Sequence, residues 1–575
     1  MTESVCAALR LDEEILDSET GSISCEFRSR SDGNLFALRG GDGISLELRI
    51  VGSSLVYEAT VPGRWSKLEA EDVRSLDDGR WHSAVVTVSS AGTRLYLDGY
   101  QVFCGTTTAF LKDLPGLTQA VVGQGDSPEV TAFTVHPRVL TSREVLALSK
   151  RAEPLVEVAA NRLSPHDVAR FADVRHGSFW LRFRVRGRMQ QGALLAAGGH
   201  GREQLTVSVG PEGIAYTAVS TTGERRQVKA TGAWSDGGWH EVVVSVGHGA
   251  VDLYVDGFRE THAPGEFFLA GVEGLDEIVV GQDCEGVRLS GEVQRAGLYD
   301  YALSDAQIKR LSEVEPIETD ALFDRGYCGS ASYRIPSLLT LSSGTILAGV
   351  DQRVSNANDS PNDINFVVRR SLDEGRSWEP ASTVIDCPGI GEDASSVIDS
   401  CMVQDPGTGR VYVLIDHFPG GIGQPNCWAS TGFDEQGRRL LRDLDDGRYV
   451  VEPDGAVTTI EGQATEFRVL DDGTVLRDGN PAGNIELAPG ADPAETLLAI
   501  PTSYLQIAYS DDDGLTWSRP RDLNPELKQP WMRFLGTCPG NGIALRNGPH
   551  AGRLIVPLYF NNDQNWLAMC ATVAY

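Results

Sequence analysis

Short runs in which apolar and polar residues alternate fill much of the chain, and small turn-forming steps separate the runs. Leu95-Tyr96-Leu97 is one such run, and it ends at Asp98-Gly99. Similar steps occur at Asp78-Gly79, Asp256-Gly257 and Asn547-Gly548, and glycine accounts for 63 of the 575 residues. Alternation with a period of two is typical of strands with one buried face, and Asp-Gly or Asn-Gly steps favour tight hairpin turns. The pattern predicts an all-β protein.

The first half of the chain contains a long internal repeat. Three motifs recur 158 residues later: Asp78–Val86 as Asp236–Val244, Leu95–Gly99 as Leu253–Gly257, and Val121–Gln124 as Val279–Gln282. A spacing of this size indicates duplication of a whole domain and not a short-period solenoid. Within each copy, strands alternate with Asp-Gly turns, which predicts an antiparallel β-sandwich.

Each copy ends with the signature of a short helix. Thr141-x-x-Glu144 and Ser304-x-x-Gln307 have the spacing of capping boxes, in which the hydroxyl accepts from a free amide and the later side chain reaches back. We therefore predict two sandwich domains, at 1–152 and 153–315.

A third region, 321–575, carries a different repeated motif, Ser-x-Asp-x-Gly-x-Ser/Thr-Trp. The carboxylate of such a motif accepts from turn amides, glycine supplies a positive φ, and tryptophan packs back between strands. Repeated hairpins of this kind indicate propeller blades. Residues 431–500 are predicted to form an all-β insertion between the two copies. The key positions of the two motifs are Ser371, Asp373, Gly375, Trp378, Ser510, Asp512, Gly514 and Trp517.

The charge of the chain limits the classes of ligand. Fifty basic against 80 acidic residues give a net charge of -30, which argues against nucleic acid and anionic membrane surfaces. A small anion still fits, because screening over about 8 Å lets a few arginines set the local field. No membrane span or signal peptide is visible. The ten cysteines have no Cys-x-x-Cys spacing, and we expect most to be buried; His82, His240 and His550 lack metal-ligand spacing, so we expect no metal.

The repeated domains resemble concanavalin-like, laminin-G-type sandwiches, which commonly serve as carbohydrate-binding modules on glycosidases. The resemblance rests on the Trp-His pairs, the Leu-Tyr-x-Asp-Gly segments and the closing helices. Trp81 and Trp239 precede alternating valines, so we interpret them as core or turn packing and not as sugar platforms. No ligand residue is assigned in either sandwich.

The third region resembles the bacterial exo-α-sialidases of glycoside hydrolase family 33. Tyr333-Arg334-Ile335-Pro336 followed by two of the Ser-x-Asp motifs, known there as Asp boxes, carries the resemblance, which spans about 321–575. It implies a six-bladed β-propeller that uses no cofactor. It also implies retaining hydrolysis of terminal sialic acid from glycoproteins, glycolipids and oligosaccharides, outside the cell or at its surface.

The same resemblance implies roles for individual residues. Arg334 falls on one of three arginines that clamp the sialic acid carboxylate, for which the planar guanidinium fork suits better than lysine; the alternative is a surface ion pair. Asp359 falls on the acid/base aspartate, with Asp363 as the competing assignment. Ile335 would flank the sugar ring. Arg353 and Asp399 would contact its hydroxyl and N-acyl edge, or else form a blade ion pair or core contact.

Sialidases use a neutral tyrosine as nucleophile, which avoids repulsion by the substrate carboxylate. The resemblance places this tyrosine, its glutamate and two further arginines in later blades, after a third Asp box. The 255 residues from Ala321, less the insertion, suffice for about half of a six-bladed ring at about 40–50 residues a blade. We therefore expect that the sequence stops before the nucleophile, that Tyr575 is not the nucleophile, and that this chain alone is inactive. Two alternatives remain open: a sialoglycan-binding adhesive lectin with an inert propeller remnant, and a trans-sialidase.

Overall fold

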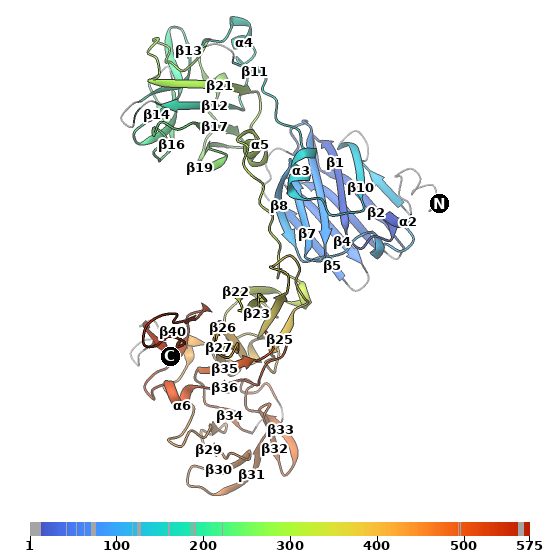
Figure 1. The fold of residues 1–575 in the computed structure, drawn as a ribbon, viewed down its shortest axis with the longest axis vertical. Coiled ribbons are helices and arrows are strands. Elements are labelled where there is room, and N and C mark those ends of the chain that lie inside the picture. The colour runs from blue at the N-terminus through green and yellow to red at the C-terminus, as the bar shows by residue number, and fades with distance from the viewer. Residues whose placement is uncertain are drawn as a thin grey trace. The chain divides into compact units, whose positions relative to one another are not determined.

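The structure, a computed structural model, divides into two units, Met1–Asp320 and Ala321–Tyr575. Strands make up nearly all of its regular structure (Figure 1), which confirms the predicted all-β fold. Gln124, Cys6 and Tyr575 lie outside the described residues. The structure describes residues 13–41, 43–52, 54–61, 64–70, 76–117, 119–123, 128–158, 161–185, 187, 191–220, 222–492, 494, 496–561 and 569–574.

The first sandwich consists of two five-stranded antiparallel sheets. One has the order β10 (Glu129–His136), β1 (Gly21–Arg28), β6 (His82–Ser89), β7 (Gly92–Leu97) and β8 (Tyr100–Gly105). The other has the order β5 (Arg64–Ala70), β4 (Ser54–Val61), β3 (Ser45–Val51), β2 (Gly33–Arg39) and β9 (Gln119–Val122). Their inward side chains, among them Phe27, Leu38 and Val86, form one buried core. A short helix, α2 (Glu13–Leu16), precedes β1.

The second sandwich repeats this topology. One sheet has the order β11 (Val156–Glu157), β21 (Gly291–Tyr299), β12 (Gly177–Val185), β17 (His240–Gly247), β18 (Ala250–Val255) and β19 (Phe258–Pro264). The other has the order β16 (Arg225–Ala230), β15 (Gly213–Val219), β14 (Arg202–Gly210), β13 (Gly192–Gly199) and β20 (Leu275–Val280). The duplicated motifs therefore occupy equivalent strands. A helix, α4 (Pro165–Ala169), precedes β12.

The helices that close the two sandwiches have the predicted caps. α3 (Ser142–Leu148) begins after Thr141, whose hydroxyl accepts from the Glu144 amide at 3.3 Å while the Glu144 carboxylate accepts from the Thr141 amide at 2.9 Å. α5 (Asp305–Leu311) has the same reciprocal pair between Ser304 and Gln307. Both capping boxes are confirmed.

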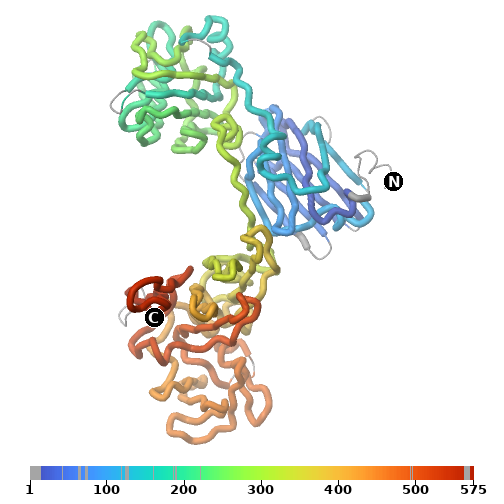
Figure 2. The backbone as a smooth tube through the Cα atoms, viewed as in Figure 1, coloured from blue at the N-terminus to red at the C-terminus, as the bar shows by residue number. Residues whose placement is uncertain are grey.

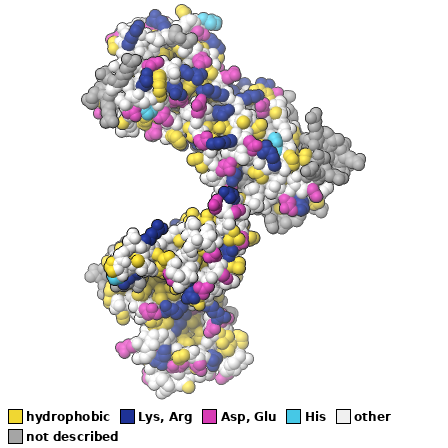
Figure 3. Space-filling model, in the orientation of Figure 1, with side chains coloured by type: hydrophobic (Ala, Val, Ile, Leu, Met, Phe, Trp, Pro, Cys, Tyr) yellow, Lys and Arg dark blue, Asp and Glu magenta, His cyan; other side chains and the backbone are white. Residues whose placement is uncertain are grey.

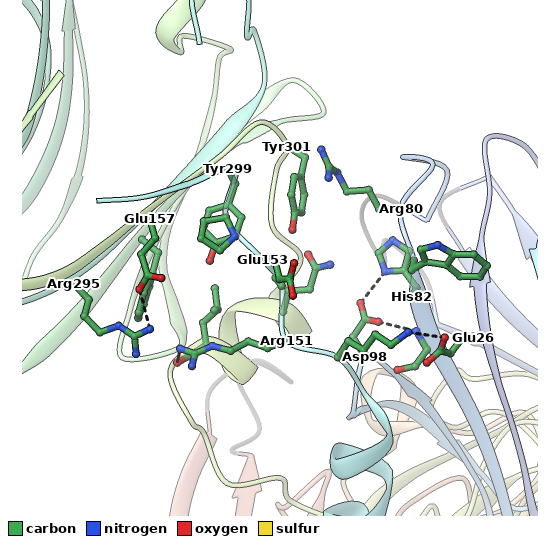
Figure 4. A pocket seen from close by; sticks show the side chains of 18 residues that line it. Glu26, Arg80, His82, Asp98, Arg151, Glu153, Glu157, Arg295, Tyr299 and Tyr301 are labelled. Carbon is green, nitrogen blue, oxygen red and sulfur yellow. Dashed lines mark hydrogen bonds and ion pairs between the residues drawn. The ribbon is translucent and has the colours of Figure 1, made fainter. Parts of the chain in front are cut away.

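In the first Trp-His pair the histidine is more deeply buried than the tryptophan. Trp81 is 38% exposed under the guanidinium of Arg28, so the core alternative is wrong for it. The buried member of the pair is His82, which contacts Asp98 at 2.8 Å (Figure 4) and Asp78 at 3.3 Å. Burial opposes charge on this ring, but the two carboxylates outweigh burial and raise the pKa of His82 to about 10. The imidazolium therefore joins two Asp-Gly turns.

The second unit begins with two four-stranded antiparallel meanders, which are arranged as propeller blades. The first has β22 (Ser332–Thr340), β23 (Ile346–Arg353), β24 (Ile364–Ser371) and β25 (Ser382–Ile385); the second has β26 (Ser396–Gln404), β27 (Val411–Phe418), β35 (Tyr504–Ser510) and β36 (Arg521–Asp522). A third group follows the short helix α6 (Asn524–Leu527). In it, β40 (Leu554–Asn561) pairs with β37 (Leu535–Thr537), β39 (Ile543–Ala544) and β41 (Met569–Ala574), while β38 (Gly540–Asn541) pairs with β26.

Between β27 and β35 the chain leaves the second blade, forms a separate sheet and returns (Figure 2). This inserted sheet has the order β33 (Asn480–Asn484), β32 (Thr474–Arg477), β31 (Ala464–Val469), β30 (Ala456–Thr459), β29 (Arg448–Val451), β28 (Leu440–Arg442) and β34 (Leu498–Ala499). It has a small core of its own, which includes Leu441 and Val475.

The two Ser-x-Asp motifs form the same turn in equivalent places, between the third and fourth strands of the first two blades. In the first, Asp373 accepts from the Ser377 amide at 2.8 Å, and Trp378 donates from its indole to the Gly375 carbonyl at 3.2 Å. In the second, the corresponding distances, from Thr516 to Asp512 and from Trp517 to Gly514, are 2.8 and 3.1 Å. Ser371 and Ser510 accept from the amides of Gly375 and Gly514, whose φ values are positive.

Several surface features complete the description. Lys and Arg side chains lie among Asp and Glu on the visible face and do not gather into one basic stripe (Figure 3). Among the described residues, no helix is long and apolar enough to cross a membrane. Of the nine described cysteines, only Cys25, Cys387, Cys401 and Cys427 are buried, so the expectation that most are buried is wrong. The other five, Cys104, Cys284, Cys328, Cys538 and Cys570, are half-buried or exposed.

Candidate functional site

Two β-bulges shape the candidate site. The first strand of each of the first two blades is bulged: β22 between Arg334 and Ser337, and β26 between Ile398 and Cys401. Within the bulges Ile335 has φ +57° and Asp399 has φ +64°. A β-branched residue in this region is strained, and such strain is typical of functional sites. Bulges re-aim side chains, so the two strands present Arg334 and Asp399 differently from regular strands.

The structure brings Arg334, Arg353 and Asp359 together. Nη1 of Arg334 donates to Oδ1 of Asp359 at 3.2 Å, and Nη1 of Arg353 donates to the same oxygen at 2.6 Å. Both guanidinium groups also donate to the Ala357 carbonyl, at 3.2 and 3.1 Å. The side chains of Arg334 and Asp359 are 45% and 65% exposed. A cation and a carboxylate therefore share one open surface.

The two candidate acids differ in their surroundings. Asp359 extends to the arginines, whereas Asp363 is buried, and burial raises its pKa. Asn362, which sequence reasoning missed, separates them along the loop. Its fully buried amide donates to the carbonyls of Asn356 and Asn358, both at 3.0 Å. Asn362 thus holds the loop that presents Asp359, and an asparagine in an Asn/Ser/Pro loop carries no sequence signal for that role.

Arg353 has no exposed surface and also pairs with the buried Asp351, at 3.2 Å. Burial raises the pKa of Asp351 well above its usual value. These contacts match the alternative of a blade ion pair. Arg353 therefore reaches Asp359 from the buried side.

Asp399 is half-buried beside the cluster. Tyr559 of β40, also missed from the sequence, donates its hydroxyl to Oδ2 of Asp399 at 3.4 Å. Burial and then the charge of Asp359 raise the pKa of Asp399. The fully buried Asp416 accepts from the Thr537 amide at 2.8 Å. Burial raises the pKa of Asp416 well above its usual value. Carboxyl groups thus outnumber cations here, and their mutual repulsion adds to burial in raising the pKa values of Asp351, Asp399 and Asp416.

This arrangement suits recognition of an anion next to an acid–base group. Arg334 has exposed N–H groups for a planar carboxylate, and Asp359 is held close by with one oxygen toward the arginines. Ile335 is half-buried in the bulge beside Arg334. Among the described residues, no group of three His, Cys, Asp or Glu side chains has the arrangement of a metal site.

Two relatives of this chain carry sialidase or anhydrosialidase names. Anhydrosialidase of Macrobdella decora is 30% identical over 340 residues, 51% of this chain and 44% of that protein. Sialidase B of Streptococcus pneumoniae is 26% identical over 367 residues, 55% of this chain and 52% of that protein. The chain thus spans about half the length of the curated relatives it matches.

Two further comparisons concern the fold. The solved structure of leech intramolecular trans-sialidase complexed with 2,7-anhydro-Neu5Ac matches with a TM-score of 0.44 and 21% identity, covering 74% of this chain and 73% of that one. A family model described as the concanavalin A-like lectin/glucanases superfamily matches residues 177–309. Sequence similarity to sialidases over about half of the chain confirms the predicted resemblance, and the second sandwich matches the concanavalin A-like superfamily.

Proposed function

We propose that these residues belong to a retaining exo-α-sialidase that removes terminal sialic acid from glycans outside the cell or at its surface. The observation that carries the proposal is the contact of Arg334 with Asp359 on an open surface, in a chain homologous to sialidases. The same surface fits the substrate, which has a carboxylate on the carbon that undergoes substitution.

Each residue of the cluster receives a role. Arg334 binds the sialic acid carboxylate and fixes the ring. Asp359 donates a proton to the leaving oxygen and then accepts one from water, as the acid/base residue of a retaining glycosidase does. Arg353 holds Asp359 from the buried side, while Asp399 and Ile335 border the ring. No described residue is assigned as the nucleophile.

Binding and turnover test the proposal separately. We expect the chain to bind free sialic acid in saturation-transfer NMR, and Arg334→Ala to weaken binding at least tenfold. Arg376→Ala is the matched control, because Arg376 is an exposed arginine paired with Glu374 on an Asp-box turn. Equal binding by wild type and Arg334→Ala, or none by either, contradicts the assigned clamp. Turnover of a fluorogenic sialoside, with analysis of its products, separates hydrolysis from trans-sialylation.

A second function, glycan binding by the sandwiches, is supported by the superfamily match at 177–309. A glycan array probed with the chain tests it, with Arg334→Ala included to remove binding by the second unit. Sialoglycan binding that survives Arg334→Ala supports the lectin hypothesis, whereas a blank array leaves the enzyme hypothesis intact and rejects the lectin.

A further inference from the structure

The inserted sheet contacts the loops that surround the candidate site. The chain enters the insertion through the segment Pro419–Cys427, which follows β27 and is called the bridging loop below. This loop has the inserted sheet on one side and the Asp359 loop on the other. The contacts on its two sides show how the insertion is linked to the site.

On the insertion side, backbone hydrogen bonds join three segments. The Gly420 amide donates to the Glu486 carbonyl at 2.7 Å, and the Gly421 amide donates to the Glu392 carbonyl at 3.0 Å. The Ala488 amide donates to the Asp393 carbonyl at 3.0 Å. A Cβ on Gly420 would overlap the Asp393 carbonyl and the Ala488 amide, so the bridging loop is in close backbone contact with the insertion.

On the site side, the bridging loop packs against the residue after Asp359. A Cβ on Gly423 would overlap the carbonyl oxygen of Ser360, so only glycine permits this approach. The Ser360 hydroxyl lies 2.6 Å from the hydroxyl of Ser396, at the start of β26. The Asp359 loop is thus fixed from outside by Gly423, as it is from inside by Asn362.

Hydrogen bonds within the bridging loop restrain it, so the loop can transmit the position of the insertion to the site. The Asn426 side chain accepts from the Gly423 amide at 2.8 Å and donates to the Gly421 carbonyl at 2.9 Å. Cys427 is buried and donates from Sγ to the Gly423 carbonyl at 3.4 Å. One side chain therefore connects Gly421, at which a Cβ would lie 3.4 Å from the Cβ of Ala488, with Gly423, which faces the site.

A buried ionic contact fixes Glu486, the residue of the insertion that binds the bridging loop. Arg439, from the insertion, pairs with Glu486 at 2.8 Å, and His417 at the end of β27 lies 3.5 Å from the same carboxylate. All three side chains are largely buried, and an ion pair in such a place has one favoured geometry. These side-chain contacts restrain Glu486, whose backbone carbonyl accepts from the Gly420 amide.

We propose that the inserted sheet is a positioning element of the active site, and that Gly423 and Asn426 transmit its position to the loop that carries Asp359. The inference rests on the proposed function for the role of Asp359. It assigns to the insertion an indirect effect on the reaction, through the position of Asp359.

Gly423→Ala is the main test. Gly423 has φ -142°, which any residue adopts, so the substitution introduces no backbone strain but only the close contacts with Ser360 and Pro361. Gly407→Ala is the matched control, because its Cβ would meet only the flexible Asp405 side chain. We expect Gly423→Ala to raise amide hydrogen exchange across residues 356–363 at least tenfold. The pKa of Asp399 should move down toward its ordinary value as Asp359 withdraws, which carboxyl NMR of 13C-labelled aspartate measures.

Asn426→Ala provides a second route, because Asn426 is exposed and its loss creates no clash. It should produce a smaller change of the same kind, and Asn426→Asp, which keeps the acceptor for Gly423, should restore part of it. In a form of the protein that turns over a sialoside, both alanine variants should lower kcat with KM within threefold of wild type. Unchanged exchange and unchanged Asp399 titration in both alanine variants overturn the proposal. If sialic acid binding proves independent of Arg334, the proposed function fails, whereas the exchange result still reports the coupling.

Discussion

Two clusters of cations and carboxylates, one in each unit, have opposite designs. In the first sandwich, the His82 side chain is 1% exposed and both of its ring nitrogens contact carboxylates. In the second unit, Arg334 and Asp359 contact each other but remain about half exposed, beside strained residues. A closed cluster stabilises a fold, because every charge has its partner within the protein. An open cluster retains hydrogen-bonding capacity for a ligand.

The second sandwich shows how burial changes the contribution of the same contacts to stability. His240 reaches Asp256 at 2.8 Å and Asp236 at 3.1 Å, distances like those of His82. Its partners are each 47% exposed, whereas those of His82 are 8% and 15% exposed. Solvent screens the exposed copy, so identical geometry contributes less stability there.

The largest effect is expected at the open cluster. In a form of the protein that turns over a sialoside, Asp359→Asn should lower that turnover by about 10²–10⁴-fold, since the amide cannot transfer the proton. Sialic acid binding should change less than threefold, because Arg334 keeps its exposed N–H groups. Steady-state kinetics on a fluorogenic sialoside, with NMR binding alongside, measures both. Asp363→Asn is the matched comparison; a larger loss there than at Asp359 reverses the assignment of the acid.

Breaking the closed cluster should affect stability. His82→Gln leaves two poorly exposed carboxylates without a cation and should destabilise the fold by about 3–5 kcal/mol, as loss of one partner of a buried ion pair does. His240→Gln should cost about 0–1 kcal/mol, as exposed pairs do. Denaturant unfolding of the full chain, with hydrogen exchange to locate the change, compares the two. Equal losses contradict the argument from burial.

The same cluster predicts a pH dependence. Because the folded-state pKa of His82 is raised to about 10, its stabilising contribution is complete below the unfolded value of about 6.5. It decreases as pH rises and is lost above about 10. Exchange of the Ser83 amide, which donates to Asp98, measured between pH 6.5 and 10 and corrected for the intrinsic rate, should show protection falling with pH. In His82→Gln this slope should disappear.

The smallest effect is expected at the Asp-box turns. Trp378→Phe removes the indole hydrogen bond to Gly375 and should destabilise the second unit by about 1 kcal/mol. Trp517→Phe should have a similar effect, because its bond to Gly514 has the same geometry. Thermal unfolding followed by the backbone circular dichroism signal, which does not rely on the substituted tryptophans, provides the measurement. A loss confined to one turn argues against their equivalence.

The amino-acid sequence by itself determined the features that depend on neighbours in the chain. The Ser-x-Asp turns, the capping boxes of α3 and α5, and the duplication follow from contacts within a few residues or from direct repetition. The resemblance to sialidases likewise rests on contiguous motifs around Arg334. Such features need no knowledge of distant segments, because the interacting groups are separated by only a few bonds.

The tertiary structure decided which residues meet. Spacing along a loop did not distinguish Asp359 from Asp363, since the direction of each side chain depends on Asn362 and the arginines. The burial of Arg353, the exposure of Trp81 and the positive φ of Asp399 likewise depend on packing between strands distant in sequence. The role inferred for Gly423 arises only where the insertion and the site loop touch. Bringing distant segments together costs conformational entropy, which the interactions of the whole fold offset. No local sequence pattern therefore indicates such contacts.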